Sequence, residues 1–207
     1  MTASDNAPEA VKILISGGFG VGKTSMVSSV SEITPLRTEE VFTERSIESD
    51  DLSAVELKAT TTVAMDFGRI TLADDLVLYM FGTPGQERFW HMWDDMLHGA
   101  LGGIVLVDTR RLESSFFAVD FFEERGLPFI VAVNCFYGQR LHTSEQVGTA
   151  LALAPNVRVE TFDARHRTSC LSILLVLLDE LISLRSAQLQ RGAAKSAPGM
   201  NGQMRWD

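Results

Sequence analysis

The sequence predicts an α/β fold in which a mostly parallel sheet is covered by helices on both faces. Segments of strand pattern and helix pattern alternate along the chain, which is typical of such folds. The strand segments are short and mostly apolar, as in parallel sheets that are buried on both sides. The chain has 207 residues, which suits one domain with short extensions.

The first half of the chain predicts one strand, one helix and a hairpin. Residues 11–16 form a β-type run that ends in two glycines, and residues from 23 to about 31 suit a helix. Residues 32–60 show no clear period and contain eight acidic residues against three basic ones. We therefore expect a long acidic connection there, and connections of that length are usually functional or disordered. Segments 62–72 and 76–81 flank a turn-like sequence, so they predict a hairpin that adds one antiparallel edge strand.

The second half predicts three further strands and four helices, which brings the sheet to six strands. Ser114 is expected to cap one helix, and Thr143 and Gln146 have the spacing of a capping box at the start of another. The predicted strands are 103–107, 129–133 and 157–162, and the predicted helices are 87–98, 114–125, 143–153 and 168 to about 189.

The two ends of the chain lack the patterns of the middle. Residues 191–207 contain glycines, Pro198 and no apolar period. We therefore expect a flexible N-terminus at 1–10, one folded domain at 11–190 and a disordered tail at 191–207.

Composition excludes several classes of protein. The formal net charge is −9, and binding to a nucleic-acid backbone usually needs a basic face, so nucleic acid is not an expected partner. No apolar run reaches the roughly 18 residues of a membrane-spanning helix, and the ends carry neither a signal-peptide pattern nor a lipidation motif. We expect a cytoplasmic protein without direct membrane insertion, with Cys135 and Cys170 as reduced thiols.

The segment Gly17–Thr24 fits the phosphate-binding pattern G-x-x-x-x-G-K-[ST] in full. It follows an apolar strand and opens a helix, so backbone N–H groups and the helix dipole would face the phosphates. Lys23 would reach the β- and γ-phosphates, and the Thr24 hydroxyl would ligate Mg²⁺. The residues expected to contact the nucleotide here are Gly17, Phe19, Gly20, Val21, Gly22, Lys23, Thr24 and Ser25.

Two later segments resemble the switch regions of Ras-like small GTPases, which are P-loop NTPases. Residues 82–87 resemble the switch II pattern D-x-x-G-Q-E, and residues 62–67 resemble a switch I threonine followed by Asp-Phe. Within that family the chain is similar to the bacterial group encoded in actinobacterial conservon operons, over about residues 11–185. The further site residues that the resemblance implies are Thr62 for Mg²⁺, Gly85 for the γ-phosphate and Gln86 as the catalytic residue that orients the attacking water.

Two residues depart from the family pattern. Gly82 stands where the family has an aspartate that binds a Mg²⁺ water, which predicts weaker metal binding or slower hydrolysis. The MglA-type bacterial GTPases resemble this chain in lacking that aspartate. Phe19 stands close to where an arginine finger would approach, so it would either hinder a partner's arginine or pack against switch II.

The base-binding segments match the family in part. Asn134 fits the pattern N-K-x-D, but Cys135 replaces the lysine and Tyr137 replaces the aspartate that accepts two hydrogen bonds from guanine. Residues 163–165, Asp163-Ala164-Arg165, resemble the S-A-K loop, whose N–H at Ala164 would reach the guanine carbonyl. Three interpretations are open: a preference for GTP, equal binding of GTP and ATP, or weak binding by a degenerate switch.

From these features we expect a nucleotide-dependent switch that binds GTP or GDP with Mg²⁺ and hydrolyses GTP slowly. ATP and ADP are the alternative nucleotides. A binding module without turnover and a P-loop small-molecule kinase are the competing functions. The resemblance implies protein partners at the switch regions, of the Roadblock type, and recruitment to a membrane by a partner; the oligomeric state is open.

Three residues near the switch segments carry more than one interpretation. Trp90 and Met92 follow switch II, and aromatic residues and methionine are enriched at interfaces, so they would contact an effector or pack in the core. Arg45 would be a solvated loop residue or an internal arginine finger.

Overall fold

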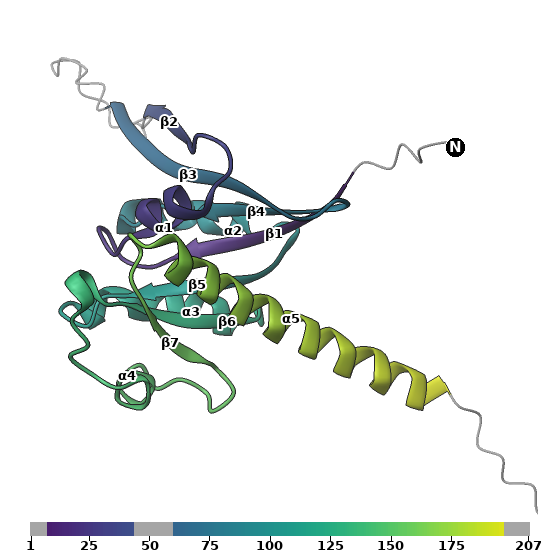
Figure 1. Cartoon of the computed structure of the whole chain (residues 1–207). Helices are drawn as coiled ribbons and strands as arrows, with labels where there is room; N and C mark the ends of the chain where they lie inside the picture. Colours follow the sequence, from purple (N-terminus) through teal and green to yellow (C-terminus); the bar gives the residue numbers. More distant parts are fainter. Residues whose placement is uncertain (1–7, 44–59, 197–207) are drawn as a thin grey trace, which may run out of the picture.

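The computed structural model describes residues 8–43 and 60–196. They form a single sheet with helices packed on both of its faces (Figure 1). The strands are β1 Glu9–Ser16, β2 Leu36–Thr43, β3 Thr60–Ala73, β4 Leu76–Gly82, β5 Ala100–Val107, β6 Phe129–Asn134 and β7 Val159–Phe162. The α-helices are α1 Lys23–Val30, α2 Trp93–Met96, α3 Phe116–Glu124, α4 Ser144–Ala150 and α5 Arg167–Ser196. Short 3₁₀ turns lie at Glu87–Met92, Leu112–Ser115 and Phe136–Gly138.

The described strands form one sheet of seven strands in the order β2-β3-β4-β1-β5-β6-β7. The five strands from β4 to β7 in that order pair in parallel. β3 runs antiparallel to both of its neighbours, β2 and β4. Because β1 is central, its carboxyl end meets those of β4 and β5 at one edge of the sheet, which is where ligands bind in open α/β folds.

Two apolar clusters, one on each face, hold the central strand. Ile13 and Ile15 of β1 lie in the cluster that α1 and α5 cover. Leu14, between them, lies in the opposite cluster with Trp93 and the apolar face of α3. Successive strand residues point to opposite faces, so β1 is clamped from both sides and its carboxyl end is a rigid base for the loop that follows.

The predicted fold class, α/β with a mostly parallel sheet and helices on both faces, is confirmed. The seventh strand, β2, forms inside the segment that we predicted to be an irregular connection. It pairs with β3 from Leu36↔Phe67 to Thr43↔Thr60. β2 is therefore the edge strand of the sheet, and the antiparallel strand β3, which we predicted at the edge, lies between β2 and β4. The acidic sequence of β2 has no alternation of its own, and pairing with β3 supplies the strand conformation.

Both ends of the domain extend further than predicted. β1 begins at Glu9, inside the predicted flexible N-terminus, because the Glu9 amide donates to the Asp75 carbonyl at 2.7 Å and the strand pairs with β4 from that point. α5 continues to Ser196, beyond the predicted boundary at 190, because a single Gly192 among good helix formers does not end a helix. The rest of the two predicted flexible ends, 1–7 and 197–207, lies outside the described residues.

Local helix predictions had mixed outcomes. The capping box of Thr143 and Gln146 at the start of α4 is confirmed. The predicted cap Ser114 is wrong: its hydroxyl donates to the Arg111 carbonyl, and α3 begins only at Phe116 after a 3₁₀ turn. The predicted helix 87–98 is a 3₁₀ turn followed by the single turn α2.

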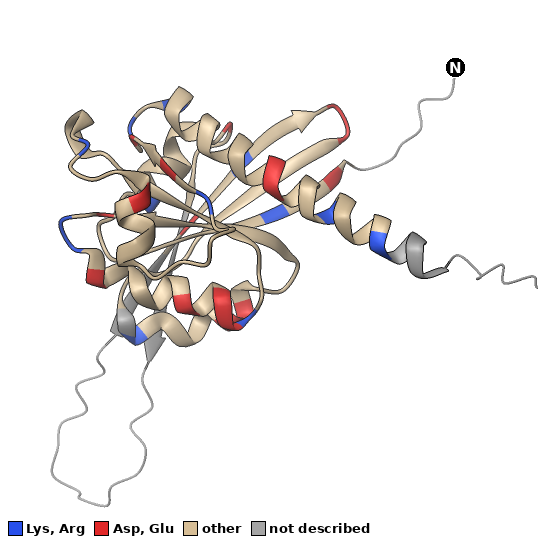
Figure 2. Ribbon diagram, turned by 90° about the horizontal axis from the view of Figure 1, so that it is seen from below, with Lys and Arg blue, Asp and Glu red and all other residues tan. Residues whose placement is uncertain are grey.

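Charged residues of the described chain are spread over several elements (Figure 2). Arg110 and Arg165 each pair with a nearby aspartate, at 2.8 Å and 2.6 Å, so these positive charges are locally neutralised. None of the helices in the described ranges is both long and apolar enough to cross a lipid bilayer.

Candidate functional site

The loop between β1 and α1 has a backbone that suits glycine. Gly17, Gly20 and Gly22 have φ values of 133°, 75° and 112°, in the range where a Cβ atom is unfavourable. A Cβ atom on Gly22 would also lie 2.6 Å from Nδ2 of Asn134. The glycines therefore let the loop fold closely over the end of the sheet.

Lys23 turns back into this loop. Its Nζ donates to the carbonyls of Gly17 and Gly18, both at 2.8 Å, and the residue is 8% exposed. Burial lowers the pKa of Lys23 to about 8, while the negative charge of Asp66 acts in the opposite direction. An ammonium group with so little water around it is stabilised by any anion that reaches it.

The amino terminus of α1 opens onto the same loop. Its N-cap is Gly22, and among the described residues no side chain caps its first turn and no acidic residue lies in that turn. The first N–H groups of a helix have no partner inside the helix, and the helix dipole favours negative charge there. Together with Lys23, these donors suit the oxygens of a phosphate chain.

Thr24 and Asp66 place two oxygen groups beside Lys23. The Thr24 hydroxyl donates to Asp66 Oδ2 at 2.5 Å, and Asp66 is 8% exposed. Hydroxyl and carboxylate oxygens suit Mg²⁺, which takes its remaining ligands from phosphates and waters, so the pair fits a Mg²⁺–nucleotide complex. Thr62, the other predicted Mg²⁺ ligand, lies on β3 opposite Val41, and its side chain lies outside the described part of the structure.

The segment after β4 lies against the phosphate loop. A Cβ atom on Gly85 would be 2.6 Å from Lys23 Nζ and 2.9 Å from the Cα atom of Phe19, so the Gly85 backbone lies directly beside the Lys23 ammonium. The exposed Gln86 accepts a hydrogen bond from Arg88 Nε at 2.9 Å through its Oε1 atom. In this arrangement the Gln86 side chain is held by a neighbour in its own segment.

Trp93 fixes this segment from the core. Its Nε1 donates to the Pro84 carbonyl at 3.0 Å. The Trp93 ring is 1% exposed and packs edge-on against Phe117 and Phe121 of α3, with ring centres 5.2 Å and 5.0 Å away. The backbone just before Gly85 is therefore tied to the packing of α3.

The surface residues that we singled out have different surroundings. Phe19 is 66% exposed at the tip of the loop, and Arg111 donates to its carbonyl at 3.0 Å. Trp90 stacks on Phe117 with ring centres 3.4 Å apart and packs against the α3-side cluster, which favours the core alternative for this residue. Met92 is partly buried, Ser25 is exposed on α1, and Arg45 lies outside the described residues.

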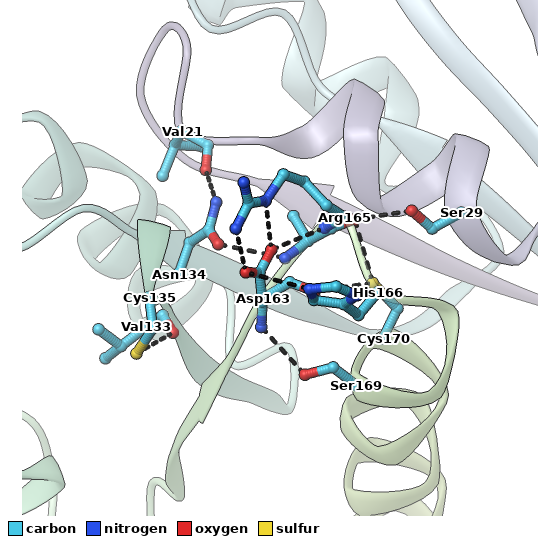
Figure 3. A network of polar contacts seen from close by, with 11 residues as sticks. Val21, Ser29, Val133, Asn134, Cys135, Asp163, Arg165, His166, Ser169 and Cys170 are labelled. Carbon is cyan, nitrogen blue, oxygen red and sulfur yellow. Dashed lines mark hydrogen bonds and ion pairs between the residues drawn. The ribbon is translucent and has the colours of Figure 1, made fainter. Parts of the chain in front are cut away.

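Asn134 ties three segments together at the other end of the site (Figure 3). Its Nδ2 donates to the Val21 carbonyl at 2.9 Å, and its Oδ1 accepts from the Ala164 amide at 3.2 Å. The Ala164 N–H, which we expected to face a guanine carbonyl, is thus already used by Asn134. Asn134 therefore holds the phosphate loop against the segment 163–165. In this structure its role is to join the segments of the predicted base-binding region.

Tyr137 and Arg165 form an exposed pair beside this network. Tyr137 is 78% exposed and has a φ of 57°, and Arg165 Cζ lies 4.8 Å from the centre of its ring. Arg165 also donates twice to Asp163, at 2.9 Å and 2.6 Å. These hydrogen bonds lower the pKa of Asp163 to about 2, so Asp163 is charged at neutral pH and keeps Arg165 over Tyr137.

Cys135 and Cys170 are both free and buried. Burial raises the pKa of Cys170 to about 11. At neutral pH this thiol is protonated, and we assign it to core packing below the segment 163–165, whose Ala164 carbonyl lies 3.4 Å from its sulfur.

One surface pocket of the described chain lies away from these residues. It is lined by residues before β6 and β7 and by the C-terminal half of α5, at the edge of the sheet opposite the phosphate loop. It contains none of the predicted site residues. A smaller pocket does lie at the candidate site, where Asn134 and Tyr137 line it together with Asp108, Arg110 and Phe136.

The structure brings most of the predicted residues together. The phosphate loop, Thr24 and Gly85 converge on Lys23, and Asn134 joins the loop to the predicted base-binding segments. Asp66 is the residue that sequence reasoning missed as part of the site. In the sequence Asp66 stands out only as part of the switch I pattern, and the signal for its place in the site is its register with Gly82 across the predicted hairpin.

Comparison with known proteins gives one family and one fold. A family model described as "Conserved hypothetical ATP binding protein" matches residues 15–197. An uncharacterized protein of Methanocaldococcus jannaschii is 27% identical over 128 residues, which are 61% of this chain and 70% of that protein.

Solved G domains share the fold. The G domain of the FeoB iron transporter of T. maritima superposes with a TM-score of 0.53 at 18% identity, over 84% of this chain and 99% of that one. The cytosolic domain of the same transporter in its GMPPNP form gives a TM-score of 0.58 at 15% identity, over 83% of this chain and 64% of that one. The fold is thus the Ras-like P-loop fold of G domains.

Proposed function

We propose a function from the premise that this chain belongs to the family of conserved hypothetical ATP binding proteins. It binds a nucleoside triphosphate or diphosphate, with Mg²⁺, at the loop Gly17–Thr24. The observation that carries this proposal is the buried Lys23 ammonium, held by two loop carbonyls beside the uncapped start of α1. These groups converge on one point and suit consecutive phosphates. The Thr24 hydroxyl would join the coordination of Mg²⁺.

The bound nucleotide would act as a switch through the segment 83–86. Gly85 lies against Lys23 and Phe19, so a terminal phosphate at Lys23 would press on this segment and a diphosphate would not. Trp93 holds Pro84 from the core, which gives the segment a path to α2 and α3. The cytosolic domain of the FeoB transporter of T. maritima has been solved in a GDP form and in a GMPPNP form, which supports a site for both nucleotide states in a fold of this kind.

The surroundings of Gln86 support the proposal that hydrolysis is slow. In the structure the Gln86 side chain accepts a hydrogen bond from Arg88 Nε. It would have to leave Arg88 to orient an attacking water, and phosphoryl transfer depends mainly on such positioning. The same contact favours the second candidate function, a binding module that holds nucleotide without turnover.

Phosphate release under multiple-turnover conditions separates these two functions. For a hydrolase, we expect release by the full chain and a loss of about 10-fold or more in rate for Gln86→Ala, with nucleotide affinity retained. The matched control is Gln190→Ala, an exposed glutamine near the end of α5, which should leave the rate unchanged. Release by Gln86→Ala at the full rate would remove Gln86 from the mechanism, and no release by the wild-type chain would favour the binding module.

Base selectivity gives a further testable prediction. An aspartate at position 137 would accept hydrogen bonds from the guanine ring N–H and the exocyclic amine, which the Tyr137 hydroxyl cannot do together. We expect Tyr137→Asp to raise the ratio of GDP to ADP affinity by about 10-fold or more, because hydrogen bonds to a charged group are strong. Calorimetric titration with the two diphosphates measures this ratio.

The control for this prediction is Tyr137→Phe. It keeps the ring beneath Arg165 and removes only the hydroxyl, so the ratio should stay at the wild-type value. If Tyr137→Asp behaves like Tyr137→Phe, residue 137 does not face the base. The three interpretations of base preference then depend on the segment 163–165 instead.

The proposed switch requires a protein partner that reads the switch segments, and the resemblance to conservon-type GTPases suggests a Roadblock-type protein. Phe19, whose backbone lies against Gly85 and whose side chain is exposed, supports such a contact. Its exposed ring offers an apolar group to a partner, and a movement of Gly85 with the nucleotide state would shift the Phe19 backbone. Recruitment to a membrane would then depend on that partner.

A further inference from the structure

Gly82 on β4 and Asp66 on β3 lie directly opposite each other on neighbouring strands. They are direct partners in the register of β3 and β4. A Cβ atom on Gly82 would lie 3.0 Å from Asp66 Cβ and 3.3 Å from Asp66 Oδ2. The volume that a side chain at position 82 would take is therefore filled by the Asp66 carboxylate.

We propose that Asp66, reaching across from β3, supplies the carboxylate of the Mg²⁺ site that Gly82 cannot supply. The inference rests on the proposed nucleotide function and names one more residue of that site. Asp66 would hold the Thr24 hydroxyl and a water of the metal, and the absence of a side chain at Gly82 is what makes room for it.

The hydrogen bond between Thr24 and Asp66 carries the argument. A threonine hydroxyl has one proton and two lone pairs, and the proton is already donated to Asp66 Oδ2 at 2.5 Å. The lone pairs are thereby turned away from the carboxylate and remain for a cation. Groups that orient a metal ligand in this way commonly change metal affinity by about 10- to 100-fold.

The surroundings of Asp66 agree with a place beside the phosphates. Asp66 lies close enough to Lys23 for its charge to act on that ammonium. Among the described residues, no group of three His, Cys, Asp or Glu side chains could hold a metal ion. Thr24 and Asp66 would thus bind the cation together with phosphate oxygens and waters, which is how Mg²⁺ is usually held by nucleotide-binding proteins.

The test separates metal binding from nucleotide binding. The full chain is first titrated with a fluorescent GTP or ATP analogue in EDTA. Mg²⁺ is then added, and the Mg²⁺ concentration that gives half of the resulting increase in nucleotide binding is measured. We expect Asp66→Asn to keep the affinity in EDTA and to require about 10- to 100-fold more Mg²⁺. The matched control is Asp74→Asn, an exposed aspartate in the turn between β3 and β4, which should behave as the wild-type chain.

A carboxylate swap checks the geometry. In the double variant Asp66→Ala/Gly82→Asp, the new side chain enters the volume that Asp66 leaves, so we expect the Mg²⁺ requirement to return toward the wild-type value. Circular dichroism establishes that each variant is folded. An unchanged Mg²⁺ requirement in folded Asp66→Asn would overturn the inference, while the absence of nucleotide binding by the wild-type chain in both EDTA and Mg²⁺ would overturn the proposed function itself.

A measurement on the unmodified chain covers the case in which Asp66→Asn does not fold. With Mn²⁺ in place of Mg²⁺ and nucleotide present, the carboxyl carbon of Asp66 should be broadened strongly in spectra of the aspartate-labelled protein, and that of Asp74 should not. An Asp66 signal as sharp with Mn²⁺ as with Mg²⁺ would contradict the proposal.

Discussion

Lys23→Ala is expected to lose nucleotide binding almost completely. The ammonium is buried and held at 2.8 Å from two loop carbonyls, where it would meet the phosphates without competing water. Removing one partner of a buried charged contact costs about 2 to 5 kcal/mol, which corresponds to roughly 30-fold or more in Kd. Calorimetry with a triphosphate in Mg²⁺ measures the change.

Lys12→Ala is the matched control for that variant. Lys12 lies on β1, and its ammonium donates to the His98 carbonyl, away from the phosphate loop. Nucleotide affinity should be unaffected by its loss. If Lys23→Ala binds as tightly as Lys12→Ala, the loop is not the nucleotide site.

The affinity should also depend on pH because of Lys23. Burial lowers the pKa of Lys23 to about 8 in the nucleotide-free fold, and bound phosphates would raise it again. Below pH 8 the ammonium is already charged and binding takes up no proton there. As pH rises above 8 the lysine must gain a proton to bind, so Kd rises by up to about 10-fold per pH unit. Titrations at pH 7 and pH 9.5 check this, and equal affinities would contradict it.

Trp93→Ala is expected to destabilise the fold by about 3 to 5 kcal/mol, the usual cost of truncating a buried tryptophan. The ring is 1% exposed and lies between Phe117 and Phe121. Its loss leaves a cavity under the switch segment and removes two edge-on aromatic contacts. Chemical denaturation followed by circular dichroism measures the free energy of unfolding.

Trp93→Phe separates packing from the hydrogen bond to Pro84. It keeps an aromatic ring in the core and removes the Nε1 donor, at a cost of about 1 to 3 kcal/mol for a buried carbonyl left without its partner. Because Pro84 precedes Gly85, we expect triphosphate affinity to fall more than diphosphate affinity. Trp90→Phe, at the neighbouring ring that stacks on Phe117, should change both affinities equally or not at all.

Local patterns explain what the sequence predicts correctly. The phosphate loop depends on glycines at positions where φ is positive and on one lysine six residues after Gly17. All of these residues lie in one short, continuous segment of the sequence. The capping box at Thr143 is equally local. The buried strands β5 and β6 are recognisable because every residue in their centres is apolar. Such features need no knowledge of distant contacts.

Pairing between strands explains what the sequence does not predict. β2 has an acidic, irregular sequence, and its strand conformation comes from the ladder with β3. The place of Asp66 in the site depends on its register with Gly82, 16 residues later in the chain. The missing aspartate at position 82 was visible, but its replacement comes from a neighbouring strand and is therefore not part of any continuous motif.

The base-binding region shows the same limit. The motif predicts that Asn134 lies in the base-binding region. Its hydrogen bonds to Val21 and Ala164 place it between the phosphate loop and the segment 163–165. The pair of Tyr137 and Arg165 was not predicted as a contact, because the two residues are far apart in sequence and meet only through β6 and β7. This pair, fixed by Asp163, is where selectivity between bases has to be tested.

Equilibrium binding of GDP, GTP, ADP and ATP to the full chain, with and without Mg²⁺, tests the central claim most directly. We expect saturable binding to a single site by at least one of the triphosphates, tighter with Mg²⁺ than without it. The ratio of guanine to adenine affinity then shows how the chain reads the base with Tyr137 in place of aspartate. Failure of all four nucleotides to bind under either condition would contradict the assignment of Gly17–Thr24 as a nucleotide site.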